Sequence, residues 1–204
     1  MCSNAGGGGG GGMLNKDSTT TVLSSHPLTD YIGKGGSLFA NEIMNTRDAF
    51  EREYGAAAKN INLHVGTFGD SSTLGAYGGD TLYMNERYVT NNNLTEAMRA
   101  GAKSGFHPNI GNKSGAAAVA AHEIGHRLGQ KAAERAGVSE KDIVARAAKK
   151  MGTRTNRMAA SISGYARTNY SETIAEASTD VFCNGSKASR ASIAIMTEVK
   201  NALR

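Results

Sequence analysis

The chain of 204 residues carries a formal net charge of +5 at pH 7, and 39% of its residues are apolar and 20% charged, as in ordinary soluble globular domains. Its basic residues are scattered and are not interleaved with aromatic residues, which argues against a nucleic-acid partner. No stretch approaches the roughly 18 consecutive apolar residues that span a bilayer, so we expect no membrane segment.

Residues 1–20 are expected to form a flexible leader, because the glycine run Gly6–Gly12 is followed by polar residues. The first twelve residues contain neither a cationic start nor an apolar segment, so we expect no secretory signal. The two cysteines, Cys2 and Cys183, do not make a disulfide framework and indicate a reduced compartment. Residues 21–204 are then expected to form one domain.

The first half of this domain mixes a helix with short strands. Apolar residues recur near helical spacing over residues 38–54, and Gly55 is suited to end that helix. Residues 62–68 alternate polar and apolar side chains, which is typical of a half-buried strand. Residues 76–84 predict a turn leading into a second strand, and a short helix is expected around residues 94–101.

The second half is predicted to be mostly helical. A strong helix is expected over residues 114–130, and Ser139 is a suitable N-cap for the next one. After a polar connector, a helix is expected over residues 171–183, ending at Asn184–Gly185, and a last helix from residue 188. A helix, a small sheet and then mostly helices predict an α+β domain.

The most specific motif is His122-Glu123-Ile124-Gly125-His126. Residues four apart share one face of a helix, so both imidazoles can bind one ion, and Glu123 can reach water in an open coordination position. Bound zinc lowers the pKa of that water to about 7, and Glu123 would accept its proton as the general base. The small apolar residues that precede the motif indicate a buried helix, where histidines without a partner would be costly.

A third ligand is expected downstream, where three acidic residues lie one helical turn apart. In one arrangement Glu172 binds the metal and Glu176 accepts a hydrogen bond from a ligand histidine. In the other, Glu176 binds the metal and Asp180 takes the supporting role, because metal-bound imidazoles usually donate their other N–H to a carboxylate. Spacing leaves both arrangements open.

The segment from Ser163 to Ala177 resembles the corresponding segment of the anthrax lethal factor catalytic domain family. That family of zincin metallopeptidases pairs an HExxH helix with a downstream Tyr-x-Arg-Thr-Asn-x-x-Glu-x-x-Ala-Glu pattern, which this chain repeats from Tyr165 to Glu176. The two matching blocks lie between His122 and Ala177. A competing resemblance joins Glu176 and Asp180 to the Glu-x-x-x-Asp segment of thermolysin-like enzymes.

The resemblance to the lethal factor family implies a zincin-like α+β domain, with a small mixed sheet packed on the HExxH helix. It implies a zinc-dependent endopeptidase with one Zn²⁺ per chain. In this arrangement Glu172 joins His122 and His126 as a metal ligand and Glu176 supports a ligand histidine. Tyr165 would donate a hydrogen bond to the developing oxyanion.

Peptidases of this clan lay an extended protein or peptide substrate along an exposed sheet edge. The best candidate for this edge has β-prone residues and precedes the metal helix; it comprises Thr81, Leu82, Tyr83 and Met84. An ordinary core strand fits the same residues equally well. His107 lies in a predicted loop, where it could line the cleft, although a loop histidine is more often solvated.

Related zincin-like domains occur in bacteriophage virion proteins, so the resemblance also implies a phage-encoded protein in the bacterial cytoplasm or the virion, where other virion proteins would be its partners. The alternative from a different class is a catalytically silent zincin-fold component of a phage virion. The intact Glu123 argues against it, because a degenerate site would often lose the base first.

Overall fold

A computed structural model describes residues 3–4, 21–32, 37–89 and 93–204 of the chain. The leader expected over residues 1–20 therefore lies outside the described residues, except for Ser3 and Asn4. The described helices and strands form an α+β fold, as expected. None of these helices combines the length and the apolar character that a bilayer-spanning helix needs.

The sheet is small and mixed, and its five strands run in the order β1-β4-β5-β3-β2. Strand β3 pairs in parallel with β5, and β4 pairs in parallel with β1, whereas the β2–β3 and β4–β5 pairs are antiparallel. The strands are β1 (Ser3–Asn4), β2 (Val22–Pro27), β3 (Asn62–Phe68), β4 (Gly75–Gly78) and β5 (Thr81–Asn85).

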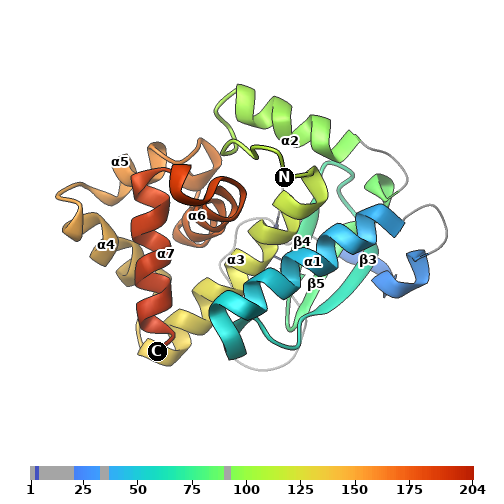
Figure 1. The fold of residues 1–204 in the computed structure, drawn as a ribbon, viewed down its shortest axis with the longest axis horizontal. Helices are drawn as coiled ribbons and strands as arrows, with labels where there is room; N and C mark the ends of the chain where they lie inside the picture. The colour runs from blue at the N-terminus through green and yellow to red at the C-terminus, as the bar shows by residue number, and fades with distance from the viewer. Residues whose placement is uncertain (1–2, 5–20, 33–36, 90–92) are drawn as a thin grey trace.

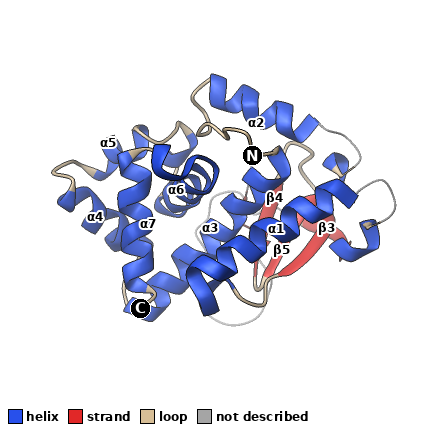
Figure 2. Ribbon diagram, in the orientation of Figure 1, coloured by secondary structure: helices blue, strands red, loops and turns tan. Residues whose placement is uncertain are grey.

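Seven α-helices accompany the sheet in the described part of the chain. They are α1 (Ser37–Tyr54), α2 (Asn93–Lys103), α3 (Gly115–Ala136), α4 (Glu140–Lys150), α5 (Thr155–Ala160), α6 (Tyr170–Asn184) and α7 (Arg190–Ala202). Helix α3 crosses the middle of the molecule, with helices α4 to α7 on one side and the strands on the other (Figures 1 and 2). It contacts β4 and β5 on one side and α6 on the other, so it links the sheet to the helical half.

Helix α3 is buried over most of its length because its first turns are nearly all small and apolar. The Ser114 hydroxyl caps its N-terminus by accepting a hydrogen bond from the amide of Ala117 at 3.1 Å. Gly137 adopts the left-handed conformation at its C-terminus, with φ of 63°, where glycine is favoured. The helix continues six residues past its predicted end, because Gly137 and not Gln130 carries the stop signal.

Helices α3 and α6 approach each other closely at Gly125. A Cβ at this position would lie 2.7 Å from the Cβ of Ser178 and 2.8 Å from the Cα of Ala175, so only glycine fits without displacement. The Ser178 hydroxyl fixes the same crossing by donating to the carbonyl of Ala121 at 3.0 Å. The backbones of the two helices are therefore near enough for side chains of α6 to reach those of α3.

Arg127 attaches α3 to the sheet and to the chain that follows α1. Its guanidinium donates to the carbonyls of Ala57 and Lys59 at 2.8 and 2.9 Å, and to the Tyr77 hydroxyl at 2.8 Å. It also forms an ion pair with Asp80, in the turn between β4 and β5. The β4–β5 hairpin is thus held in a defined position relative to the helix that carries His122 and His126.

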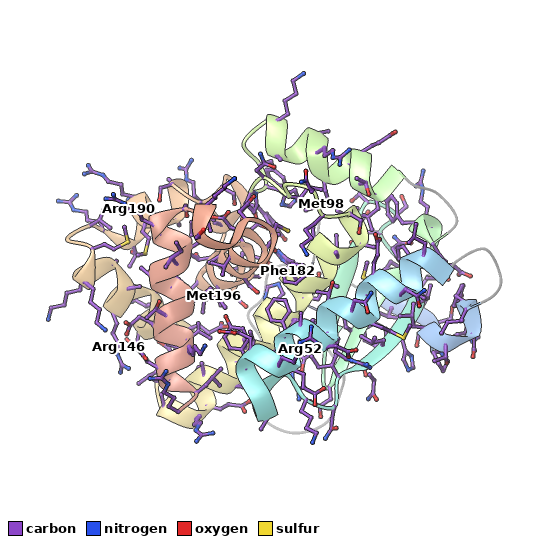
Figure 3. The ribbon with its side chains drawn as sticks, in the orientation of Figure 1. Arg52, Met98, Arg146, Phe182, Arg190 and Met196 are labelled. Carbon is purple, nitrogen blue, oxygen red and sulfur yellow. The ribbon has the colours of Figure 1, made fainter. Side chains whose placement is uncertain are left out.

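Aromatic side chains fill the space between α1 and α6. Phe182 projects from α6 toward α1 (Figure 3), where its ring stacks on that of Phe50 with centroids 5.3 Å apart.

Met98 of α2 is buried, whereas Arg146 and Arg190 lie on the outer side of the C-terminal helices (Figure 3).

Three features differ from the sequence-based expectations. The segment Thr81–Met84, expected at a sheet edge, lies inside the sheet as part of β5, between β4 and β3. Strand β2 was not predicted, because its residues do not alternate between buried and exposed positions. Helix α5 begins within the expected connector at residues 152–156, where Arg154 provides no side-chain cap.

The close crossing of α3 and α6 predicts that Gly125→Ala destabilises the fold. The added methyl group meets backbone atoms of α6, and overpacking of this kind costs about 1–3 kcal/mol, which outweighs the higher helix propensity of alanine. We expect urea unfolding in the presence of a chelator to show this loss. Gly69→Ala is the control, because a Cβ there meets only ordinary contacts. A Gly125→Ala variant as stable as the parent would contradict the close approach.

Candidate metal centre

His122 and His126 lie on one face of α3, one turn apart, and Glu172 faces them from the first turn of α6. One ligand atom from each of the three residues lies within 4.8 Å of the others, and all three residues are buried. The Oε2 atom of Glu172 is 3.0 Å from His122 Nε2 and 3.5 Å from His126 Nε2. The Nε2 atoms of His122 and His126 and the Oε2 atom of Glu172 therefore converge on one point.

The donor atoms suit a cation. His126 Nε2 is buried and has no hydrogen-bond partner among the described residues, although it points toward the carboxylate of Glu172. A buried polar atom without a partner is rare in native proteins and calls for an explanation such as an ion. Two imidazole nitrogens and one carboxylate oxygen form a set that metal ions accept, so this cluster can hold a metal ion.

Glu172 is positioned by the cap of its own helix. The Asn169 side chain accepts a hydrogen bond from the Glu172 amide at 2.8 Å, which starts α6 at the point where the carboxylate meets the imidazoles. Burial alone would raise the pKa of Glu172, but the charges and hydrogen bonds of His126 and His122 outweigh it and hold that pKa far below its usual range. The carboxylate is therefore ionised and ready to bind a cation.

Glu176 lies on the other side of the His122 ring. Its Oε1 atom is 2.9 Å from His122 Nδ1, and its Oε2 accepts from the Ser163 hydroxyl at 2.7 Å. Burial would raise the pKa of Glu176, but hydrogen bonds from His107 and His122 lower it to about 2. Glu176 thus occupies the position of the carboxylate that orients a metal-bound histidine.

Asp180, which one of the two arrangements required near the metal, is engaged elsewhere. Its carboxylate accepts from the Asn184 side-chain amide and from the Ser189 backbone amide, both at 2.9 Å. These bonds connect the end of α6 to the start of α7. The arrangement with Glu172 in the cluster and Glu176 behind His122 is the one that fits the geometry.

His126 has its own polar partner on the side away from the cluster. Its Nδ1 is 2.9 Å from the Ser171 hydroxyl, which in turn is 3.3 Å from the carboxylate of Glu140 on α4. Burial raises the pKa of Glu140 above its ordinary value. Sequence reasoning missed this chain of contacts, because Glu140 looks like an ordinary acidic residue in the first turn of a helix.

Tyr165 lies beside the cluster, in a 3-10 turn at Tyr165–Arg167. Its ring stacks on the His122 ring with centroids 6.0 Å apart. The loop after α2 holds this turn, because the amides of Gly164 and Tyr165 donate to the carbonyls of Gly105 and Phe106 at 2.8 and 3.0 Å.

Of the two expectations for His107, the solvated side chain is wrong. The residue is only 6% exposed, and its Nδ1 is 3.2 Å from Glu176 Oε1. Its ring also contacts the Tyr165 ring edge to face, with centroids 5.5 Å apart. No local sequence signal marks this role, because it depends on the loop folding back onto α6.

Glu123 is fully buried on α3, on the side that faces β4. A Cβ at Gly75, in β4, would lie 3.3 Å from Glu123 Oε1 and 2.8 Å from a methyl group of Val119, so a glycine is needed where the strand passes the carboxylate. The helix periodicity places Glu123 next to His122 but turned toward the sheet. The carboxylate of the expected general base thus lies against β4.

Comparison of the chain with protein families, with curated proteins and with solved structures finds no match. Membership in the lethal factor family is therefore supported only by the resemblance of the two sequence blocks. The site itself is supported by the geometry described above.

The raised pKa values of the ligand histidines predict that metal binding releases protons. Burial would lower the pKa of His122, but Glu172 and Glu176 outweigh it and hold that pKa well above its ordinary value; that of His126 is raised by Glu172. Because a metal binds only the neutral imidazole, affinity should rise with pH below these pKa values, about tenfold per unit for each displaced proton. Calorimetric Zn²⁺ titrations in buffers of different ionisation enthalpy measure this release. Heats that do not depend on the buffer would show that the imidazoles are already neutral.

Proposed function

We propose that the protein is a zinc-dependent endopeptidase of the zincin type, with one Zn²⁺ bound by His122, His126 and Glu172. The observation that carries the proposal is the convergence of two imidazole nitrogens and one carboxylate oxygen in a buried cluster. Three protein ligands of these types are typical of catalytic zinc sites, which leave a further position for water or substrate. The resemblance to the lethal factor family supports the same assignment.

Glu123 is proposed as the general base. When bound, zinc would supply a water of lowered pKa and polarise the substrate carbonyl. The Glu123 carboxylate, adjacent in sequence to His122 and turned toward β4, would accept the proton of the attacking water and deliver it to the leaving amine. Its complete burial favours such proton transfer, because no bulk water competes for the carboxylate.

Tyr165 is proposed to stabilise the oxyanion. The stacking of its ring on His122 keeps the phenol beside the cluster, and the two backbone hydrogen bonds to the loop after α2 restrict the turn that carries it. A donor held in place before the reaction stabilises the developing charge without reorganisation.

The substrate strand is assigned to β4 in place of the expected Thr81–Met84 segment. Strand β4 passes Glu123 at Gly75, and on its outer side it pairs only with the two residues of β1, whereas β5 lies between β4 and β3. An extended peptide that adds to the outer edge of β4 would lie beside Glu123 and would bind through backbone groups. Ser3 and Asn4 pair there with Ala76 and Tyr77, so a substrate would take the place of this short pairing.

Glu123→Gln is predicted to abolish cleavage while leaving metal binding intact. The substitution keeps the volume and removes the base, so a loss of at least about 100-fold in kcat is expected. The measurement is cleavage of a peptide library by the zinc-loaded protein, with and without chelator, followed by mass spectrometry. Glu134→Gln, an exposed change on the same helix, is the matched control. Zinc binding without any cleavage by the parent protein would favour the catalytically silent structural alternative.

Tyr165→Phe is predicted to lower kcat about 100-fold with little change in KM or in zinc content, because only the hydroxyl that meets the oxyanion is lost. Steady-state kinetics on a peptide that the parent cleaves would measure both constants. A variant with unchanged kcat would remove Tyr165 from the mechanism without affecting the role of Glu123.

A further inference from the structure

Glu176 is shared by two imidazoles. His107 Nδ1 lies 3.2 and 3.3 Å from the two oxygens of Glu176, and His122 Nδ1 lies 2.9 Å from one of them. Because an ionised carboxylate can only accept, both Nδ1 atoms carry a hydrogen and donate it. The Ser163 hydroxyl donates to the second oxygen, so the fully buried Glu176 side chain has three donors around it.

The three donors contact the Glu176 carboxylate in different ways. His122 donates to one oxygen of Glu176 and Ser163 to the other, and His107 is the one donor that approaches both oxygens. The nearly equal distances from His107 to both oxygens place its N–H between them, so it helps the other two donors to hold the plane of the carboxylate. In this plane one oxygen is directed at His122, and the opposite nitrogen of the His122 ring points into the metal cluster.

The same His107 ring also contacts Tyr165. The two rings meet edge to face with centroids 5.5 Å apart, and Tyr165 in turn stacks on His122. The Tyr165 ring therefore contacts both imidazoles, and Glu176 is hydrogen-bonded to both of them. A displacement of His107 would therefore displace both the Glu176 carboxylate, which is hydrogen-bonded to His122, and the phenol of Tyr165.

His107 is itself held rigidly by α2. The amides of Phe106 and His107 both donate to the carbonyl of Gly101, at 2.8 and 3.2 Å. A Cβ at Gly101 would lie 2.7 Å from the His107 ring, so the ring is packed directly against the helix backbone. Gly105, with φ of +75°, makes the turn that brings the loop back onto α2.

We propose that His107 is a positioning residue of the site, which donates to Glu176 to orient His122 toward the metal and contacts Tyr165 to keep its phenol beside His122. This inference rests on the proposed function for what Tyr165 and the metal do. Its first half, the orientation of Glu176 and His122, concerns the protein alone. The two halves are separable, because one depends on the N–H donor and the other on the ring.

Two variants separate these contributions. His107→Phe keeps an aromatic ring and removes the donor, whereas His107→Asn places an amide N–H near the position of Nδ1 and removes the ring. Cobalt(II) is the probe, since its visible absorption reports coordination geometry and its titration gives affinity. Outer hydrogen-bond partners typically contribute 10–100-fold to metal affinity, and His107 acts through one such partner, so about tenfold weaker Co²⁺ binding is expected for His107→Phe.

The expected results differ between the variants. His107→Phe should weaken Co²⁺ binding and change its visible spectrum, and His107→Asn should restore both to within about threefold of the parent. With a cleaved peptide, His107→Asn should still lower kcat more than KM, because the phenol of Tyr165 loses its neighbour. His26→Phe and His26→Asn, at an exposed position in β2, are the matched controls.

The outcomes that overturn the proposal are distinct from those that overturn the proposed function. Folding of each variant is checked by thermal unfolding of the metal-free protein, and His107→Asn provides the test if His107→Phe does not fold. Parent-like Co²⁺ affinity and spectrum in a folded His107→Phe variant, or weak Co²⁺ binding by a folded His107→Asn variant, would refute the positioning role. A parent protein that binds Co²⁺ but cleaves nothing would refute the proposed peptidase activity. The Co²⁺ affinities of the variants would still test whether His107 orients Glu176.

A metal-free measurement covers the remaining case, in which the parent protein binds no Co²⁺. Proton NMR of the metal-free chain should show the Nδ1 protons of His107 and His122 as slowly exchanging downfield signals, because both are buried and hydrogen-bonded to Glu176. His107→Phe should remove one signal and speed the exchange of the other. An unchanged His122 signal in that variant would overturn the proposal.

Discussion

The candidate site depends on the close approach of α3 and α6 at Gly125. Helix α3 supplies both imidazoles and Glu123, and helix α6 supplies Glu172 and Glu176. These short side chains can meet only if the two helix backbones are nearly in contact, and a side chain larger than hydrogen at Gly125 would separate them. The glycine before the second histidine of the HExxH motif is therefore a packing requirement, which the metal chemistry alone does not explain.

The crossing brings charges together in the interior, and the surrounding structure compensates for their burial. Three glutamates and three histidines are buried there: Glu123, Glu172, Glu176, His107, His122 and His126. Removing such groups from water is costly unless each is paired or bound to a metal. Glu176 has its donors within the protein, whereas Glu172 and the inner nitrogens of the ligand histidines face one another, and a cation there would satisfy all three. In the metal-free protein His122 lies between the carboxylates of Glu172 and Glu176, and a proton on its ring partly compensates their negative charge.

Local periodicity explains how much of the site the sequence could predict. His122, Glu123 and His126 follow from the 3.6-residue repeat of one helix, and the α+β class follows from the order of the elements. The choice of Glu172 over Glu176 required the resemblance to a known family, because both lie on the same face of α6. Tyr165 was likewise identified through that resemblance, and its position beside His122 fits it.

The features that sequence reasoning missed depend on contacts between distant segments. The approach of His107 to Glu176 spans 69 residues of chain and requires a loop that folds back on α2. The contact of Glu140 with Ser171 requires α4 to pack near the start of α6. Strand order is also nonlocal, and for this reason Thr81–Met84 was placed at an edge although Gly75–Gly78 lies beside Glu123.

The central claim is that His122, His126 and Glu172 bind a single metal ion together. The most direct test is an anomalous difference map from crystals grown with Zn²⁺, recorded at the zinc absorption edge. One strong peak per chain is expected, about 2.0–2.2 Å from the Nε2 atoms of His122 and His126 and from an oxygen of Glu172, with Glu176 outside the coordination sphere. A peak bound by Glu176 in place of Glu172, or no peak between the imidazoles at saturating zinc, would contradict it.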